Sequence, residues 1–231
     1  MNLLSHFYID KDHPSAYFKL GLIFPDIYPH YNQNLRKAVE SHRHLSVEHD
    51  YFVQGIKRHH EVDKIFHNSP VFKMLNTAFK EALLNSALPQ LHYRTYYLGH
   101  ILVELLIDKQ LIRGEKDLLN QFYTSLDEID ENTLHQYFIH INTVEKTSDF
   151  FSNFKRFREN RYLYYLNDNE KLIEALMRMY CRVNPATLTN SEKELLVNVT
   201  KVLENTYMGK LRDALTNVME SLTFPYKTKH E

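Results

Sequence analysis

The stretch YYLGHILVELLI, residues 96–107, is the longest strongly apolar segment of the chain and decides its fold class. Apolar residues would lie on nearly every side of the helix that this stretch forms, a pattern typical of a helix buried among other helices. The stretch is too short to cross a bilayer, and it contains His100 and Glu104. We therefore expect a buried helix over residues 89–113 in a protein without a membrane span.

The composition extends this expectation to the whole chain. Gly occurs 5 times and Pro 7 times in 231 residues, so the turn residues that all-β folds require are scarce. The length suits one core, and neither an internal repeat nor a dividing linker is visible. We predict an all-α fold, with a single compact multi-helix domain over residues 1–231.

Start and stop signals give the expected boundaries of the helices. Two prolines four residues apart predict a loop over residues 24–30, and Ser191 with Glu194 fits a capping box. Helices are expected over residues 14–24, 47–66, 70–85, 89–113, 115–129, 132–141, 148–165, 170–183 and 191–222.

Charge and cysteine content limit the partners and the compartment. The net charge of -1 provides no global field toward nucleic acid or an anionic membrane, so a charged partner must meet a local patch. The lone Cys181 cannot form an internal disulfide, and the first residues lack the pattern of a secretory signal. We expect a cytoplasmic protein that does not bind nucleic acid.

Four histidines are followed four residues later by a carboxylate, one helical turn away. Such a pair can bind one divalent ion, but chance gives roughly two pairs at these residue frequencies. We interpret the first two of the four as accidental pairs. The pairs are His6/Asp10, His44/Glu48, His59/Asp63 and His100/Glu104.

The surroundings of the last pair are the most informative. Leucine, isoleucine and valine surround Glu104, and a buried carboxylate is rare unless it is paired or coordinated. We favour metal binding or catalysis for His100 and Glu104 over a satisfied structural pair. For His59 and Asp63 the spacing alone leaves both interpretations open, and His60 faces about 100° away from that pair.

Short blocks of the sequence resemble the acyl carrier protein phosphodiesterases. The opening MNLLSH, residues 1–6, is similar to the family's M-N-F/Y-L-A/G-H, and Gly21 with Asp26 is similar to its G-N-x-x-x-D. Residues 55–63, GIKRHHEVD, resemble its G-I-x-x-H-R-x-I-D. The closing region, from Tyr162 to Arg182, is similar to the family's last motif, so the resemblance covers a core of about residues 1–183 and leaves the helix over 191–222 as an addition.

A more distant likeness concerns the order of metal ligands in the zinc-dependent phospholipase C and single-strand nuclease fold. That fold binds three metals through His, Asp, His, His-x-x-x-Asp, His and His-x-x-x-Glu. This chain offers residues of the same types in the same order: His6, Asp26, His30, His59, Asp63, His67, His100 and Glu104.

Both resemblances imply an all-helical, metal-dependent phosphodiester hydrolase. The ion, manganese or zinc, would polarise the phosphoryl oxygens and activate a water, with Asp63 and Glu104 as the catalytic carboxylates. The implied substrate is the phosphopantetheine arm of acyl carrier protein, or another phosphodiester. Gly99 stands where the phosphodiesterases have Asp, so an inactive helical binding protein on the same scaffold is the main alternative, and a purely structural bundle is a third.

Basic and aromatic residues in the last third of the core predict a binding face. Arginine binds phosphate and carboxylate through paired hydrogen bonds, although an ordinary solvated helix face has the same composition. The residues are Lys155, Arg156, Arg158, Arg161, Tyr162, Arg178 and Arg182.

Overall fold

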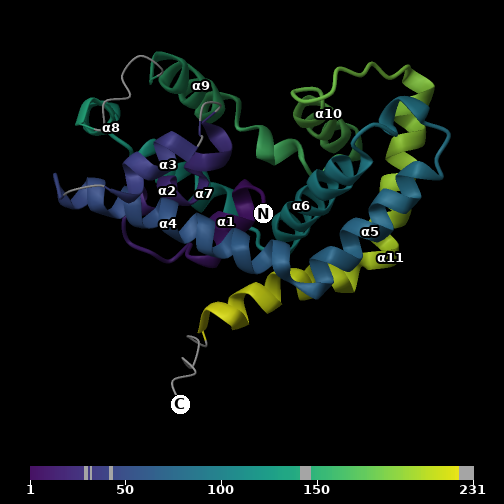
Figure 1. The fold of residues 1–231 in the computed structure, drawn as a ribbon, viewed down its shortest axis with the longest axis horizontal. Helices are drawn as coiled ribbons and strands as arrows, with labels where there is room; N and C mark the ends of the chain where they lie inside the picture. Colours follow the sequence, from purple (N-terminus) through teal and green to yellow (C-terminus); the bar gives the residue numbers. More distant parts are fainter. Residues whose placement is uncertain (29–30, 32, 42–43, 141–146, 224–231) are drawn as a thin grey trace. The chain divides into compact units, whose positions relative to one another are not determined.

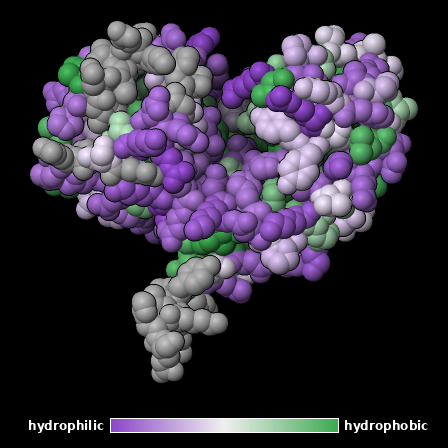
Figure 2. Space-filling model, in the orientation of Figure 1, coloured by the Kyte–Doolittle hydropathy of each residue, from purple (hydrophilic) through white to green (hydrophobic). Residues whose placement is uncertain are grey.

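The computed structural model describes residues 1–28, 31, 33–41, 44–140 and 147–223. Every regular element among these residues is an α-helix or a short 3-10 helix, which confirms the predicted all-α class. None of the described helices combines the length and the apolar character needed to span a bilayer, and the face drawn in Figure 2 is largely hydrophilic.

The contacts between helices divide the chain into two units. Unit 1 contains Met1, residues 62–114 and the residues from Tyr165 onward, and unit 2 contains residues 2–61 and 115–164. The division falls inside helix α4, Val47–Asn68, whose last turns belong to unit 1. The single domain over residues 1–231 stays a prediction.

Unit 1 is built around α6, which carries the apolar stretch. The helices that lie wholly in unit 1 are α5 (Pro70–Leu84), α6 (Thr95–Gly114), α10 (Asn169–Tyr180) and α11 (Asn190–Thr223). Helix α6 packs against α5, α10 and α11, and Leu98, Leu102 and Leu105 are fully buried there (Figure 1). Neighbours on several sides explain why α6 is apolar nearly all round, as predicted for a buried helix.

Helix α11 is joined to α6 by a buried ionic cluster. The ammonium group of Lys109 donates to Glu204 at 2.8 Å, and the Arg113 guanidinium donates to the same carboxylate at 2.6 Å. Lys109 and Glu204 are almost completely buried, so their pairing offsets the cost of removing both charges from water. Helix α11 is therefore an integral part of unit 1.

Unit 2 contains the remaining helices and an aromatic core. They are α1 (Leu3–Ile9), α2 (Ala16–Ile27), α3 (Gln33–Glu40), the first part of α4, α7 (Leu118–Asp127), α8 (Glu131–His140) and α9 (Thr147–Asn160). Helix α2 packs against α1 and α7, and α9 packs against α7 and α8. The ring of Phe24 lies 5.0 Å from that of Phe52 and 5.3 Å from that of Phe150.

Two glycines allow α2 and α4 to approach closely within unit 2. A Cβ atom on Gly21 would lie 2.3 Å from the carbonyl oxygen of Phe52, and one on Gly55 would lie 2.1 Å from the carbonyl oxygen of Phe18. Neither position can hold a larger residue without separating the two backbones. The close approach sets His59 of α4 beside the carbonyl group of Leu22.

Several predicted boundaries are wrong, each for a local reason. The expected loop over residues 24–30 begins too early, because α2 continues through Pro25 to Ile27. The helix expected over 89–113 is divided into a 3-10 turn, Pro89–Leu91, and α6, and the one over 148–165 into α9 and a 3-10 turn, Tyr162–Tyr165. A left-handed residue, at φ 51° for Arg94 and φ 43° for Arg161, precedes the second element in each case.

The cap of α11 is also displaced from its predicted position. The Oγ1 of Thr189 accepts from the backbone N–H of Glu192, whose carboxylate accepts from the backbone N–H of Thr189 at 2.7 Å. This reciprocal pair is a capping box two residues before the predicted Ser191 and Glu194, because the helix already begins at Asn190. Helices α1 and α3 were not predicted.

Candidate metal centre

Unit 1 brings three predicted ligands to one point. His67 comes from the last turns of α4, while His100 and Glu104 lie one turn apart on α6. One ligand atom from each of these residues lies within 4.8 Å of the other two. The Nε2 of His100 donates to Oε1 of Glu104 at 2.9 Å, and the Nε2 of His67 lies 3.8 Å from the same oxygen. Two imidazoles and a carboxylate at this separation are a suitable ligand set for one divalent ion.

Asp63 adds a second carboxylate to this group. It lies one turn before His67, and its Oδ1 is 3.4 Å from the Nε2 of His67. The α-ammonium group of Met1 is 2.6 Å from Asp63 and 3.1 Å from Glu104. A positive group between two carboxylates occupies the electrostatic position that a bound cation would take.

The charges around Glu104 keep its side chain ionised. Burial by itself would raise the pKa of Glu104, but the ammonium group of Met1, the hydrogen bond from His100 and the nearby imidazoles lower that pKa to about 2. A carboxylate in this form can bind a cation at neutral pH without first losing a proton.

One imidazole nitrogen of the group lacks a hydrogen-bond partner in the part of the chain that the structure describes. The Nδ1 of His67 is buried and is unpaired among the described residues. The rings of His67 and His100 each meet the edge of Phe72, with centroids 4.9 and 5.0 Å apart. An unpaired polar atom against an apolar wall costs free energy, and the nitrogen of His67 that faces the carboxylates is Nε2, not this Nδ1.

Gly99 does not face the ligands. It is buried on α6, and an added Cβ would lie 3.0 Å from Oδ1 of Asn76 and 3.2 Å from the backbone nitrogen of Lys80, both on α5. Glycine at this position permits the close contact between α5 and α6. The absence of Asp at position 99 thus has a packing explanation in this chain.

Unit 2 holds the other predicted histidine ligands, and it holds them differently. The rings of His6 and His59 stack with centroids 4.0 Å apart, and both side chains are almost fully buried. The Nδ1 of His59 donates to the carbonyl oxygen of Leu22 at 2.8 Å, which leaves Nε2 as the acceptor nitrogen. This tautomer is suited to metal binding, and His60 instead pairs with the hydroxyl of Tyr31 at 2.6 Å.

Asp26 and His30 are the two remaining predicted ligands. Asp26 is exposed on α2 and belongs to neither of the ligand groups found among the described residues. His30 lies outside the described residues.

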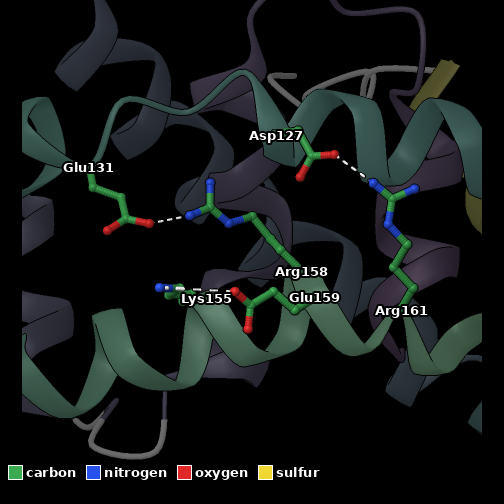
Figure 3. Close-up of a pocket in the computed structure, with 6 residues that line it drawn as sticks. All are labelled: Asp127, Glu131, Lys155, Arg158, Glu159 and Arg161. Carbon is green, nitrogen blue, oxygen red and sulfur yellow. Dashed lines mark hydrogen bonds and ion pairs between the residues drawn. The ribbon is translucent and has the colours of Figure 1, made fainter.

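The predicted basic residues are divided between the two units. Unit 2 contains a cavity of about 420 Å³ lined by Lys155, Arg158 and Arg161 together with three acidic residues (Figure 3). Arg158 pairs with Glu131, Arg161 pairs with Asp127 at 2.8 Å, and Lys155 lies 4.0 Å from Glu159. The cavity is therefore charge-balanced rather than basic.

The other members of the predicted basic face lie elsewhere. Arg156 is exposed and donates to Asn153 at 2.5 Å, and Tyr162 begins the 3-10 turn of unit 2. Arg178 and Arg182 are exposed in unit 1. The single binding face stays a prediction.

Comparisons with known proteins assign this chain to no family. Protein-family models, curated proteins and solved structures all give no match to the chain. The sequence pattern identified His67, His100 and Glu104, but it gave no sign that the ammonium group of Met1 lies among them.

Proposed function

We propose that this protein is a metal-dependent phosphodiester hydrolase whose divalent ion is held by His67, His100 and Glu104 of unit 1. The observation that carries the proposal is the convergence of the three ligand atoms within 4.8 Å. Zinc fits this set best, because it prefers a few nitrogen and oxygen ligands and leaves a position for water or substrate.

The side chains around the ion in unit 1 would have different roles. Bound here, the ion supplies Lewis acidity toward a phosphoryl oxygen and toward a water. Glu104 is ionised and mostly buried, with 13% of its side chain exposed, so it would fix the ion. Asp63 is more open, at 29%, and would orient a water or add a carboxylate oxygen to the ion. The ammonium group of Met1 would compete with the ion for both carboxylates.

The substrate is inferred from the resemblance to acyl carrier protein phosphodiesterases. Their substrate, the phosphopantetheine ester of a carrier protein, is an anionic phosphodiester, which a cationic centre attracts. The lone Cys181 suits a reducing cytoplasm as the location. The main rival is a binding protein that holds the ion without turnover.

Hydrolysis of bis(p-nitrophenyl) phosphate in the presence of zinc or manganese tests this proposal. We expect wild type to release p-nitrophenol, and His100→Ala to abolish release by removing one ligand. His92→Ala is the matched control, because His92 is exposed on the same unit outside the site. An ion bound without turnover would favour the binding-protein alternative, and a chain that binds no ion would contradict the proposal.

A further inference from the structure

Helix α6 extends the candidate metal centre toward solvent through Tyr97. Residues 97, 100 and 104 are separated by three and four positions, so Tyr97 lies on the same face as His100 and Glu104. Tyr97 is 36% exposed, compared with 13% for the side chain of Glu104. A substrate group that reaches from the ion along α6 would pass Tyr97.

Two arginines are brought to this end of α6 from different segments. Arg94 precedes the helix, and its carbonyl oxygen accepts from the backbone N–H of Tyr97 at 2.9 Å. The hydroxyl of Tyr180, at the end of α10, donates to the carbonyl oxygen of Tyr93. This bond ties the turn that contains Arg182 to the residue next to Arg94.

The tie between these segments is reinforced on the α10 side. The side-chain amide of Asn184 donates to the hydroxyl of Tyr180 at 2.6 Å, and the backbone N–H of the same residue donates to the carbonyl oxygen of Tyr180 at 3.1 Å. Residues 180–184 therefore form a closed turn against the start of α6. Arg182 is part of that turn.

Neither arginine has an acidic partner within the described parts of the chain. Arg94 and Arg182 are exposed and form no ion pair with any described residue, while Arg94 lies over the ring of Tyr93 at 5.5 Å. Burial raises the pKa of Tyr97, and the charges of Arg182, Glu104 and Arg94 also act on its hydroxyl. Both arginines are therefore close enough to Tyr97 for their charges to act on its hydroxyl.

The backbone at Arg94 has a left-handed conformation. A non-glycine residue at φ 51° is uncommon, and this backbone conformation costs free energy. An ordinary solvated helix end would not need this conformation, nor the buried tyrosine hydroxyl that fixes its neighbour. Both features fix the backbone of Tyr93 and Arg94 at the start of α6.

We propose that Arg94, Arg182 and Tyr97 form an oxyanion subsite beside the His67–His100–Glu104 group, which binds a second phosphate of the substrate. The inference rests on the proposed function, because the ion would take the reacting phosphate. The rise of an α-helix puts Tyr97 about 4.5 Å along the axis from His100 and about 10 Å from Glu104, so the subsite selects phosphodiesters whose second phosphate lies within this range of the first. Two guanidinium groups match a phosphate dianion through charge-assisted hydrogen bonds.

A matched pair of compounds tests the subsite. Thymidine 5′-(p-nitrophenyl phosphate) has one phosphate, and its 3′-phosphorylated form has a second one on the other side of the sugar. We expect zinc-loaded wild type to bind the second compound about tenfold more tightly in isothermal titration calorimetry, and Arg94→Gln and Arg182→Gln each to remove this preference. Lys201→Gln, which removes one charge from an exposed site on α11, should keep the preference.

The possible outcomes separate this inference from the proposed function. A preference lost in both arginine variants supports the subsite even if no p-nitrophenol is released, a result that would remove the hydrolase proposal alone. Equal affinity of wild type for the two compounds, undetectable binding of both, or an unchanged preference in both arginine variants would overturn the subsite. Release of p-nitrophenol without any preference would leave the hydrolase and exclude the subsite.

Discussion

Each unit brings two histidines together, and the two pairs differ in burial and in the groups that they contact. In unit 2, His6 and His59 are stacked and almost completely buried, and a backbone carbonyl binds one ring nitrogen. In unit 1, His67 and His100 keep 30% and 26% of their side chains exposed and share an ionised carboxylate, Glu104. An open histidine pair with a carboxylate of its own is the better candidate for exchangeable metal and substrate.

The largest expected effect concerns the acid side of the metal-free protein. Because the pKa of Glu104 is lowered from 4.5 to about 2 in the folded state, the unfolded state binds the proton first as the pH falls. Stability from Glu104 is complete above pH 4.5 and decreases toward pH 2, by about 3 kcal/mol in total. Urea unfolding across this pH range should show the decrease in wild type and a smaller one in Glu104→Gln. If the free energy of unfolding changed with pH in the same way in both proteins, the lowered pKa of Glu104 would be contradicted.

Removing the charge of the shared carboxylate, Glu104, should also weaken zinc binding. Glu104→Gln keeps the shape of the side chain but removes the charge that attracts the cation, so zinc affinity should fall on the order of 100-fold, or about 2.7 kcal/mol. Competition with a chromophoric chelator measures the change. Glu174→Gln, an exposed change on α10, is the control and should keep wild-type affinity.

The buried pair of unit 2 should respond mainly in stability. His59→Ala removes a ring that stacks on His6 and a buried hydrogen bond to Leu22, so the free energy of unfolding should fall by about 2 kcal/mol. The ion bound to His67, His100 and Glu104 should remain. Zinc analysis and chemical unfolding of His59→Ala check this contrast. Loss of all zinc at unchanged stability would mean that His59 binds the ion and does not mainly stabilise the fold.

A smaller effect is expected at the second carboxylate of unit 1. Asp63→Asn keeps the volume of the side chain and removes its charge, so zinc affinity should weaken about tenfold, or about 1.4 kcal/mol. His60→Ala, on the same helix, should leave zinc occupancy unchanged because His60 pairs with Tyr31. Equal metal content in both variants and wild type would exclude Asp63 from the site.

The sequence was sufficient for the parts of the fold that depend on local patterns. The apolar run over residues 96–107 predicted a buried helix, and the structure confirms it in α6. Pro25 led to a predicted end of the helix at Phe24, but α2 continues to Ile27. A proline in the last turn removes one backbone donor, and the helix is retained here. The breaks at Arg94 and Arg161 were also invisible, because neither residue type signals a left-handed backbone.

The candidate site was predictable only in part. Spacing on one helix paired His100 with Glu104, because residues four apart share a face. The approach of His67 from α4 and of the Met1 ammonium group depends on contacts between distant segments, which a periodic pattern does not encode. Gly99 looked like a lost ligand in the sequence, and the structure gives it a packing role against α5.

The most direct test of the account is the zinc content per chain of wild type beside the double variant His67→Ala, His100→Ala. Both proteins would be purified without chelator or nickel, incubated with zinc, passed through a desalting column and analysed by mass spectrometry of the metal. We expect at least one zinc per chain in wild type and one fewer in the double variant, with helical circular dichroism retained. Equal zinc content in the two folded proteins would contradict the metal centre of unit 1.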